Sequence, residues 1–120
     1  MYDIHFYKDK RGRTPFADYI RDLSKRTDKD SRIKLNKITD YLQALQVGGV
    51  GIGEPHIKHL SGELWELRPL RDRVLFAAWD GDGFILLHHF VKKTQKTPKN
   101  EIEQALRNLA DIRERGLDDE

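Results

Sequence analysis

The chain contains no cysteine among its 120 residues, which excludes disulfides, thiolate zinc sites and a cysteine nucleophile. No apolar run approaches the ~20 residues of a membrane-spanning helix, because the longest runs, VLFAAW and FILL, are strand-sized. The first ten residues, MYDIHFYKDK, also lack the apolar core of a secretory signal. We therefore expect a cytoplasmic protein without thiol chemistry or a membrane anchor.

Charged side chains are abundant but unevenly distributed. Residues 56–99 carry eight basic and five acidic side chains, whereas residues 100–120 carry three basic and seven acidic ones. The basic part of the chain suits an anionic partner. The acidic C-terminal end either has a separate role or is only a solvated helix terminus. The length predicts one domain, residues 1–120, with a modest core.

The first half of the chain predicts one strand followed by two helices. Residues 2–7 alternate as a strand does. Thr14-Pro15 predicts a helix start, with the threonine hydroxyl as N-cap and proline in the first turn. Gly48-Gly49 predicts the end of a second, longer helix. The apolar stripes of the two helices are Phe16, Tyr19, Ile20 and Leu23, and then Leu35, Ile38, Tyr41, Leu42 and Leu45.

The second half predicts three short strands and a final helix. Residues 64–70 and 73–80 alternate, and residues 84–92 are largely apolar, as expected of a strand covered on both faces. Thr97-Pro98 repeats the helix-start pair before an amphipathic segment. The predicted order is β-α-α-β-β-β-α, which is typical of an α+β fold.

Two arginines are predicted to share one face of adjacent strands. Alternation places Arg68 and Arg73 there, and a planar guanidinium can grip two oxygens of a phosphate. Such a pair suits the charge that builds on an RNA phosphodiester during cleavage. The alternative is a structural pair with Glu66, Asp72 or Glu63. Glu66 lies on the same predicted face, as a general base or as an anchor for the arginines.

Two adjacent histidines on the last predicted strand point to opposite faces. His89 is in phase with Lys93 and is predicted to share the arginine face, where it is a candidate for proton transfer. Its alternative role is packing or hydrogen bonding. His88 is in phase with apolar residues and is predicted to be a core histidine. We do not expect the pair to bind a metal, because adjacent strand side chains diverge.

Lysines gather directly after this strand. Lys92, Lys93, Lys96 and Lys99 place four cations within eight residues that contain no acid. The positive end of the following helix adds to their charge. We expect the lysines, together with Arg71, to bind RNA phosphates without a metal or other cofactor.

These segments resemble the RelE/ParE superfamily of type II toxin–antitoxin toxins, and above all its HigB-like branch, which is related to phage Gp49-type proteins. The resemblance rests on IKHLSGELWELRPLRDRVLFAAW, ILLHHFVKKTQKTP and EIEQALR, and on the N-terminal FYKDKRGRTPFADYI. It implies a RelE-like fold, in which helices pack on a small, mostly antiparallel sheet.

The resemblance also implies site residues. By position, the basic active-site residues of the family fall at Arg68, Arg73 and Lys93. Two positions that are lysine in RelE are occupied by Leu64 and Glu66, and the C-terminal tyrosine of RelE has no clear counterpart. Glu66 and His89 are therefore substitute candidates for the general base.

The activity implied by the resemblance is ribosome-dependent cleavage of mRNA by an endoribonuclease. The implied partners are the ribosome with its mRNA and a helix-turn-helix antitoxin of the HigA kind, through which alone the toxin would contact operator DNA. One alternative is a ParE-like gyrase inhibitor, although the concentrated basic group argues against it. Another is a non-catalytic nucleic-acid-binding module, which would need stacking aromatics on the basic face, whereas alternation places Trp65 and Phe76 on the core side.

Overall fold

The computed structural model describes residues 1–117, so Asp118, Asp119 and Glu120 of the acidic C-terminal stretch lie outside the described residues. The elements are β1 (Asp3–Phe6), α1 (Pro15–Lys25), α2 (Lys29–Gly48), the 3-10 helix η1 (Gly49–Ile52), β2 (Ile57–Ser61), β3 (Leu64–Leu67), β4 (Asp72–Trp79), β5 (Gly83–Val91) and α3 (Lys99–Arg115). The predicted α+β class is confirmed. Strand β2 adds to the three strands predicted in the second half.

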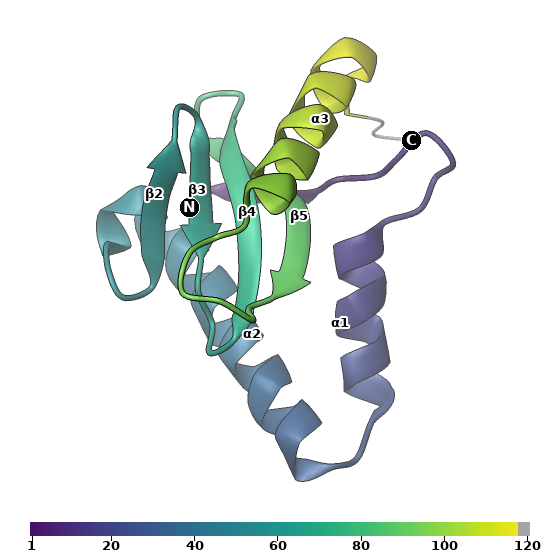
Figure 1. Ribbon diagram of the computed structural model, residues 1–120, viewed down its shortest axis with the longest axis vertical. Coiled ribbons are helices and arrows are strands. Elements are labelled where there is room, and N and C mark those ends of the chain that lie inside the picture. Colours follow the sequence, from purple (N-terminus) through teal and green to yellow (C-terminus); the bar gives the residue numbers. More distant parts are fainter. Residues whose placement is uncertain (118–120) are drawn as a thin grey trace.

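The strands form one sheet in the order β1-β5-β4-β3-β2 (Figure 1). Strands β2 to β5 pair with their neighbours antiparallel, because short turns connect them along the chain. Strand β1 pairs parallel with β5, since it is separated from the other strands by two helices. The sheet is therefore mostly antiparallel, as the resemblance implies.

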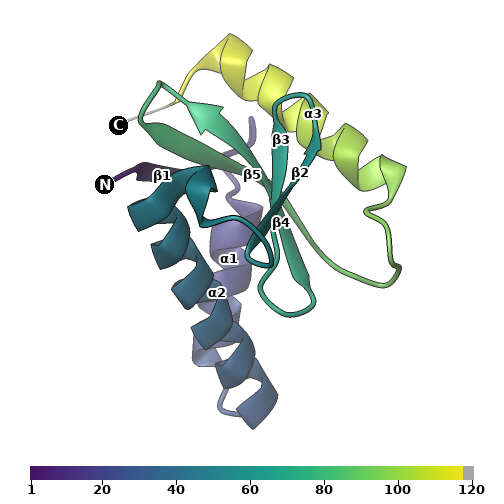
Figure 2. The same ribbon diagram turned by 90° about the vertical axis from the view of Figure 1, so that its left-hand side faces the viewer.

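Helices cover both faces of the sheet (Figure 2). Helices α1 and α2 pack on one face, to which β4 contributes the buried Val74 and Phe76. Helix α3 packs on the other face, to which β4 contributes the buried Leu75 and Ala77. Alternation along one strand thus separates two apolar clusters. Within residues 1–117, no helix is both long and apolar enough to span a membrane.

Two helix starts differ from the prediction. The Thr14 hydroxyl makes no capping hydrogen bond at α1. Helix α3 takes Pro98 as its N-cap, and the Thr97 hydroxyl donates instead to Glu66 Oε2, 2.5 Å away. The end of α2 agrees with the prediction, because Gly49 follows the helix with φ 61°, in the left-handed region that glycine tolerates.

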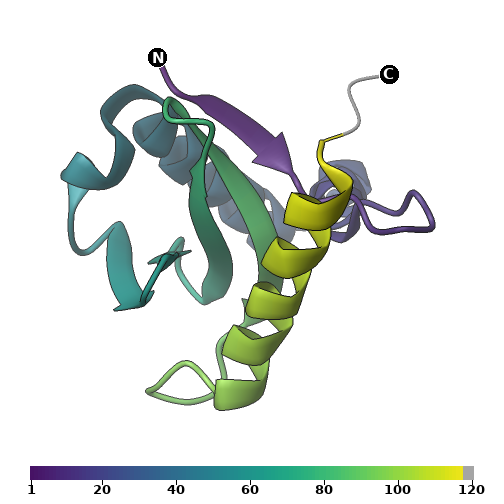
Figure 3. The same ribbon diagram turned by 90° about the horizontal axis from the view of Figure 1, so that it is seen from above.

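Strand β3 ends at Leu67, three residues before the predicted end. Pro69 has no N–H group to continue the ladder, and Leu70 turns the chain with φ 57°. The resulting turn, residues 68–71, lies beside the loop of residues 92–98. Arg71 Nη2 donates to the Lys92 carbonyl oxygen at 3.0 Å. Figures 2 and 3 place this loop at the end of the molecule away from the N-terminus.

A β-bulge on β5 changes the predicted faces of the histidines. Leu87 has no partner on β4, so the register slips there by one residue, and the extra residue breaks the alternation. His89 consequently pairs with Val74 on the face of α1 and α2. Arg73 lies on the opposite face. The prediction that His89 shares the arginine face is therefore wrong.

Candidate functional site

Glu66 lies between two arginines on the α3 face of the sheet. Its Oε1 atom is 3.6 Å from Arg68 Nε and 3.9 Å from Arg73 Nε. Its other oxygen accepts the hydrogen bond from the Thr97 hydroxyl. The residue is 2% exposed, so a substrate has little access to the carboxylate. Of the two roles considered for Glu66, this geometry favours the anchor for the arginines over the general base.

Arg73 is also buried, although slightly less than the carboxylate it faces. It is 6% exposed, and its Nη1 atom donates to the carbonyl oxygens of Leu70 at 2.8 Å and Asp72 at 2.9 Å. Burial lowers the pKa of the guanidinium below its ordinary value, while the charge of Glu66 acts in the opposite direction. Arginine nevertheless stays charged at any ordinary pH. Arg73 therefore holds the turn of residues 68–71 in place and adds a fixed positive charge beneath it.

The side chains above Arg73 are more accessible. The Arg68 side chain is 25% exposed, and Arg71 is exposed in the same turn. In the neighbouring loop and the helix start that follows it, Lys92 is partly exposed and three further lysines are exposed: Lys93, Lys96 and Lys99. The turn and the loop thus bring all the predicted RNA-binding residues to one end of the sheet.

Within residues 1–117, the hollow at this basic end is small. A hollow of about 10 Å³ lies between Arg73 and the loop, lined also by Glu66, Phe90 and Thr97. That volume is about what a single water molecule needs. A nucleotide is too large for this hollow, so one bound at this end would lie across the exposed surface of the turn and the loop.

His89 belongs to a polar cluster on the opposite face. Its Nε2 atom is 2.8 Å from Asp72 Oδ1, which also accepts a hydrogen bond from the Tyr19 hydroxyl at 2.8 Å. Lys34 Nζ lies 3.7 Å from Asp72 Oδ2. The imidazole packs on the rings of Tyr19 and Phe16, with centroids 4.1 and 5.1 Å away. Of the residues predicted for the site, His89 is the one that the structure places apart.

Asp72 is the centre of this polar cluster. Its side chain is fully buried, and burial raises the pKa of the carboxyl group. The hydrogen bonds from His89 and Tyr19 and the charge of Lys34 outweigh that effect, so the pKa lies below its ordinary value. The cluster joins α1, α2, β4 and β5. Sequence reasoning missed it because its members come from four distant segments and share no spacing.

The remaining candidates have structural partners of their own. Glu63, considered as a partner for the arginines, instead accepts from Arg113 Nη1 at 2.9 Å. His88 Nε2 lies 2.6 Å from Glu101 Oε1, which ties the first turn of α3 to β5. His88 was predicted to be a core histidine, but it is partly exposed. Within residues 1–117, no group of three or more His, Cys, Asp or Glu side chains is placed to hold a metal ion.

Comparison with known proteins gives a match to a protein family. The family described as phage-derived protein Gp49-like (DUF891) matches residues 18–110, which is 93 of the 120 residues. The matched segment contains both the turn of residues 68–71 and the loop of residues 92–98. No curated protein matches the chain. Because the match covers more than half of the chain and the fold agrees, the chain belongs to the phage-derived Gp49-like family, a RelE/HigB-like branch of toxins.

Proposed function

We propose that this chain is the toxin of a type II toxin–antitoxin system and cleaves translated mRNA in the cytoplasm as a ribosome-dependent endoribonuclease. Membership of the Gp49-like family supports a RelE-type toxin that is paired with an antitoxin. The observation that carries the finer proposal is the convergence of Arg68, Arg71 and Arg73 with the lysine-rich loop at one end of the sheet.

The chemistry that suits this site is attack by the ribose 2′-OH on the adjacent phosphorus. The new bond forms between the 2′-oxygen and phosphorus, the bond to the 5′-oxygen breaks, and negative charge builds on the non-bridging oxygens. Arg68 is exposed enough to contact these oxygens, and the buried Arg73 adds positive potential from behind. The exposed ammonium of Lys93 is suited to protonate the leaving 5′-oxygen.

Neither candidate base is positioned to take the proton of the 2′-OH, which therefore passes to solvent water as the 2′-oxygen attacks. Glu66 is enclosed by Arg68, Arg73 and Thr97, and His89 lies on the other face of the sheet. The site thus offers charge stabilisation with little help in orienting the RNA. Proximity and orientation contribute about 7–11 kcal/mol in well-aligned systems. A ribosome that holds the mRNA in its A site would supply this orientation, which is why the proposal includes the ribosome.

The test is to induce the chain in a bacterial host, with and without the neighbouring open reading frame, and to map mRNA 5′ ends. We expect growth arrest without the neighbour, new cleavage sites within translated regions, and 5′-hydroxyl and 2′,3′-cyclic phosphate ends. Arg68→Ala should reduce the cleavage rate about a hundred- to thousandfold. Arg107→Ala is the matched control, because Arg107 is an exposed arginine on α3 away from the turn.

Three outcomes would argue against the proposal. Full toxicity of a folded Arg68→Ala variant would mean that the active site lies elsewhere. Primary 5′-phosphate ends would indicate a metal-activated water as the nucleophile. Growth arrest with intact mRNA would favour either a gyrase inhibitor or a non-catalytic binding module, and a supercoiling assay separates these two.

A further inference from the structure

The edge of β5 is uncovered over its second half. Strand β1 pairs with residues 83–86, and the last hydrogen bond runs from the Tyr7 N–H to the Leu86 carbonyl oxygen at 3.0 Å. Strand β5 continues to Val91, so residues 87–91 pair with β4 but with no described strand on the other side. At about 3.3 Å per residue, this leaves roughly 16 Å of strand edge.

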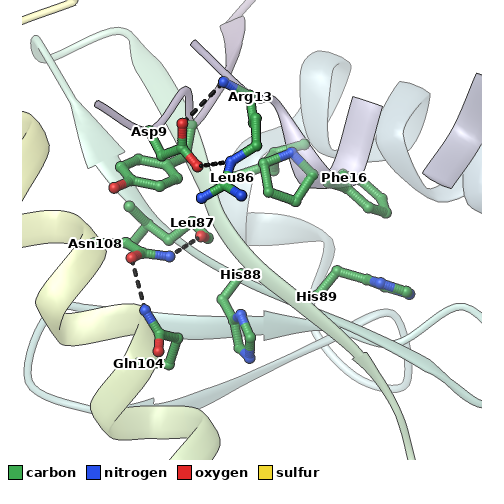
Figure 4. A pocket seen from close by; sticks show the side chains of 11 residues that line it. Asp9, Arg13, Phe16, Leu86, Leu87, His88, His89, Gln104 and Asn108 are labelled. Carbon is green, nitrogen blue, oxygen red and sulfur yellow. Dashed lines mark hydrogen bonds and ion pairs between the residues drawn. The ribbon is translucent and has the colours of Figure 1, made fainter. Parts of the chain in front are cut away.

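A cavity of about 470 Å³ opens onto this edge (Figure 4). Four consecutive residues of β5, 86–89, line the cavity. Leu86 and His89 belong to the α1 and α2 face, and Leu87 and His88 belong to the α3 face, so one cavity that touches all four looks onto the edge of the sheet. Pro15 and Phe16 form the wall on the α1 side, and Gln104 and Asn108 form the wall on the α3 side.

The backbone at this edge offers hydrogen-bonding groups to an incoming strand. The Lys92 N–H donates to the Arg71 carbonyl oxygen at 2.7 Å, and antiparallel ladders alternate in direction. Phe90 therefore points its backbone groups at β4, whereas His89 and Val91 point theirs at the open side. Asn108 Nδ2 donates to the carbonyl oxygen of the bulge residue Leu87 at 2.8 Å (Figure 4), as a neighbouring strand would.

We propose that this slot, the β5 edge of residues 87–91 between α1 and α3, receives an extended segment of the antitoxin as an added strand. An extended polypeptide supplies the alternating donors and acceptors that the edge requires, the pattern of β-strand addition. Helices α1 and α3 flank the edge, so we take the occupant to be a single extended segment and not the sheet of a second copy. The identity of the partner rests on the proposed function.

Charge at the two ends of the slot indicates acidic side chains in the incoming segment. Arg13 lies at one end with its side chain 62% exposed, although it also pairs with Asp9. The exposed Lys93 follows Val91 closely at the other end, whereas Arg71 lies on the β4 side, where it bonds the Lys92 carbonyl oxygen. A segment that reaches past Val91 would cover Lys93, and antitoxin and RNA would then compete for this cation.

Amide exchange, followed residue by residue by NMR on the wild-type toxin, tests the slot directly. The probe is the protein encoded by the open reading frame beside the toxin gene. On complex formation the amides of His89 and Val91 should exchange at least about tenfold more slowly, whereas Phe90, already bonded to β4, should change little. A complex that leaves both amides unprotected would overturn the proposal. Protection that appears in the isolated toxin and grows with its concentration would point to a second copy instead.

A proline substitution gives an independent test. Val91→Pro removes one outward N–H without breaking the ladder to β4, and Val91→Thr is the control because it keeps the N–H and the β-branched shape. We expect Val91→Pro to remain toxic but to bind the antitoxin about tenfold more weakly. If the wild type is not toxic, the proposed function is refuted. If Val91→Pro is toxic and the antitoxin neutralises it as well as it neutralises the wild type, the proposal that the antitoxin binds in the slot is refuted. Should this variant not fold, amide exchange on the wild type decides.

Discussion

At the scale of single residues, the two arginines that flank Glu66 differ in how deeply they are buried. Arg73 is 6% exposed and makes two hydrogen bonds to backbone carbonyls in addition to facing the carboxylate. The side chain of Arg68 is 25% exposed and has one ion pair, at 3.6 Å. Removing one member of a buried ion pair costs much more than removing a solvated one, because the remaining charge stays buried without its partner.

We therefore expect Arg73→Ala to lower the free energy of unfolding by about 2–4 kcal/mol. Arg68→Ala should lower it by less than about 1 kcal/mol. Urea unfolding followed by tryptophan fluorescence measures both values. Adding Glu66→Gln to Arg73→Ala should restore part of the lost stability, because the buried carboxylate, which would keep only Arg68 as an ionic partner, is then neutral. Equal losses for the two single variants would mean that burial does not distinguish them.

Asp72 makes the free energy of unfolding depend on pH under acidic conditions. Its pKa lies below the ordinary value, so the folded state releases its proton more readily than the unfolded state. The stabilisation is therefore fully present above about pH 4, the pKa of an unfolded aspartate, and is lost as the pH falls through the folded pKa. Asp72→Asn should flatten the pH dependence of urea midpoints below about pH 4. An unchanged slope would show that other carboxyl groups cause it.

At the scale of the elements, alternation predicts β3 and β4 but not the last part of β5. Glu66 and Arg73 share a face as expected, because both strands keep an unbroken two-residue period. The predicted face of His89 is wrong because one unpaired residue, Leu87, shifts the phase, and a bulge leaves no mark in the pattern of side chains. Strand β2 was not predicted, since it is short and its polar Lys58 and His59 hide the alternation.

The loop after β5 concentrates positive charge. We therefore expect this loop to cause most of the salt dependence of ribosome binding. Replacing its three lysines, together with the lysine that begins α3, with glutamine should weaken ribosome binding and reduce the slope of log affinity against log salt. The slope should fall by about 0.7 for each phosphate of a single strand that the lysines no longer neutralise. The substituted lysines are Lys92, Lys93, Lys96 and Lys99.

The matched control for these lysines removes the same total charge from the far ends of α1 and α2. It replaces the exposed Lys25, Arg26, Lys29 and Arg32 with glutamine. Equal effects of the two quadruple variants would indicate that net charge, and not the loop, governs binding.

At the scale of the whole molecule, the site is a surface at one end of a sheet and not a cleft. The hollow beside Arg73 holds about 10 Å³, so an RNA strand would not be enclosed by it. We expect purified protein to cleave free RNA weakly and translated mRNA efficiently, because the ribosome supplies the missing orientation. Primer extension on one transcript, with and without translating ribosomes, measures this ratio. Efficient cleavage of naked RNA would refute it.

Glu66 gives the folded protein a counter-anion of its own. Under the proposed function, an incoming phosphate would have to share the guanidinium of Arg68 and the positive potential of the buried Arg73 with this carboxylate, so one phosphate alone would gain little over the resident charge. A chain of phosphates would engage the turn and the lysine-rich loop together, and such linked contacts strengthen one another through high effective concentration. The internal carboxylate would therefore act as a threshold: free nucleotides and inorganic phosphate would occupy the surface poorly, whereas a polynucleotide, through its linked contacts, would bind.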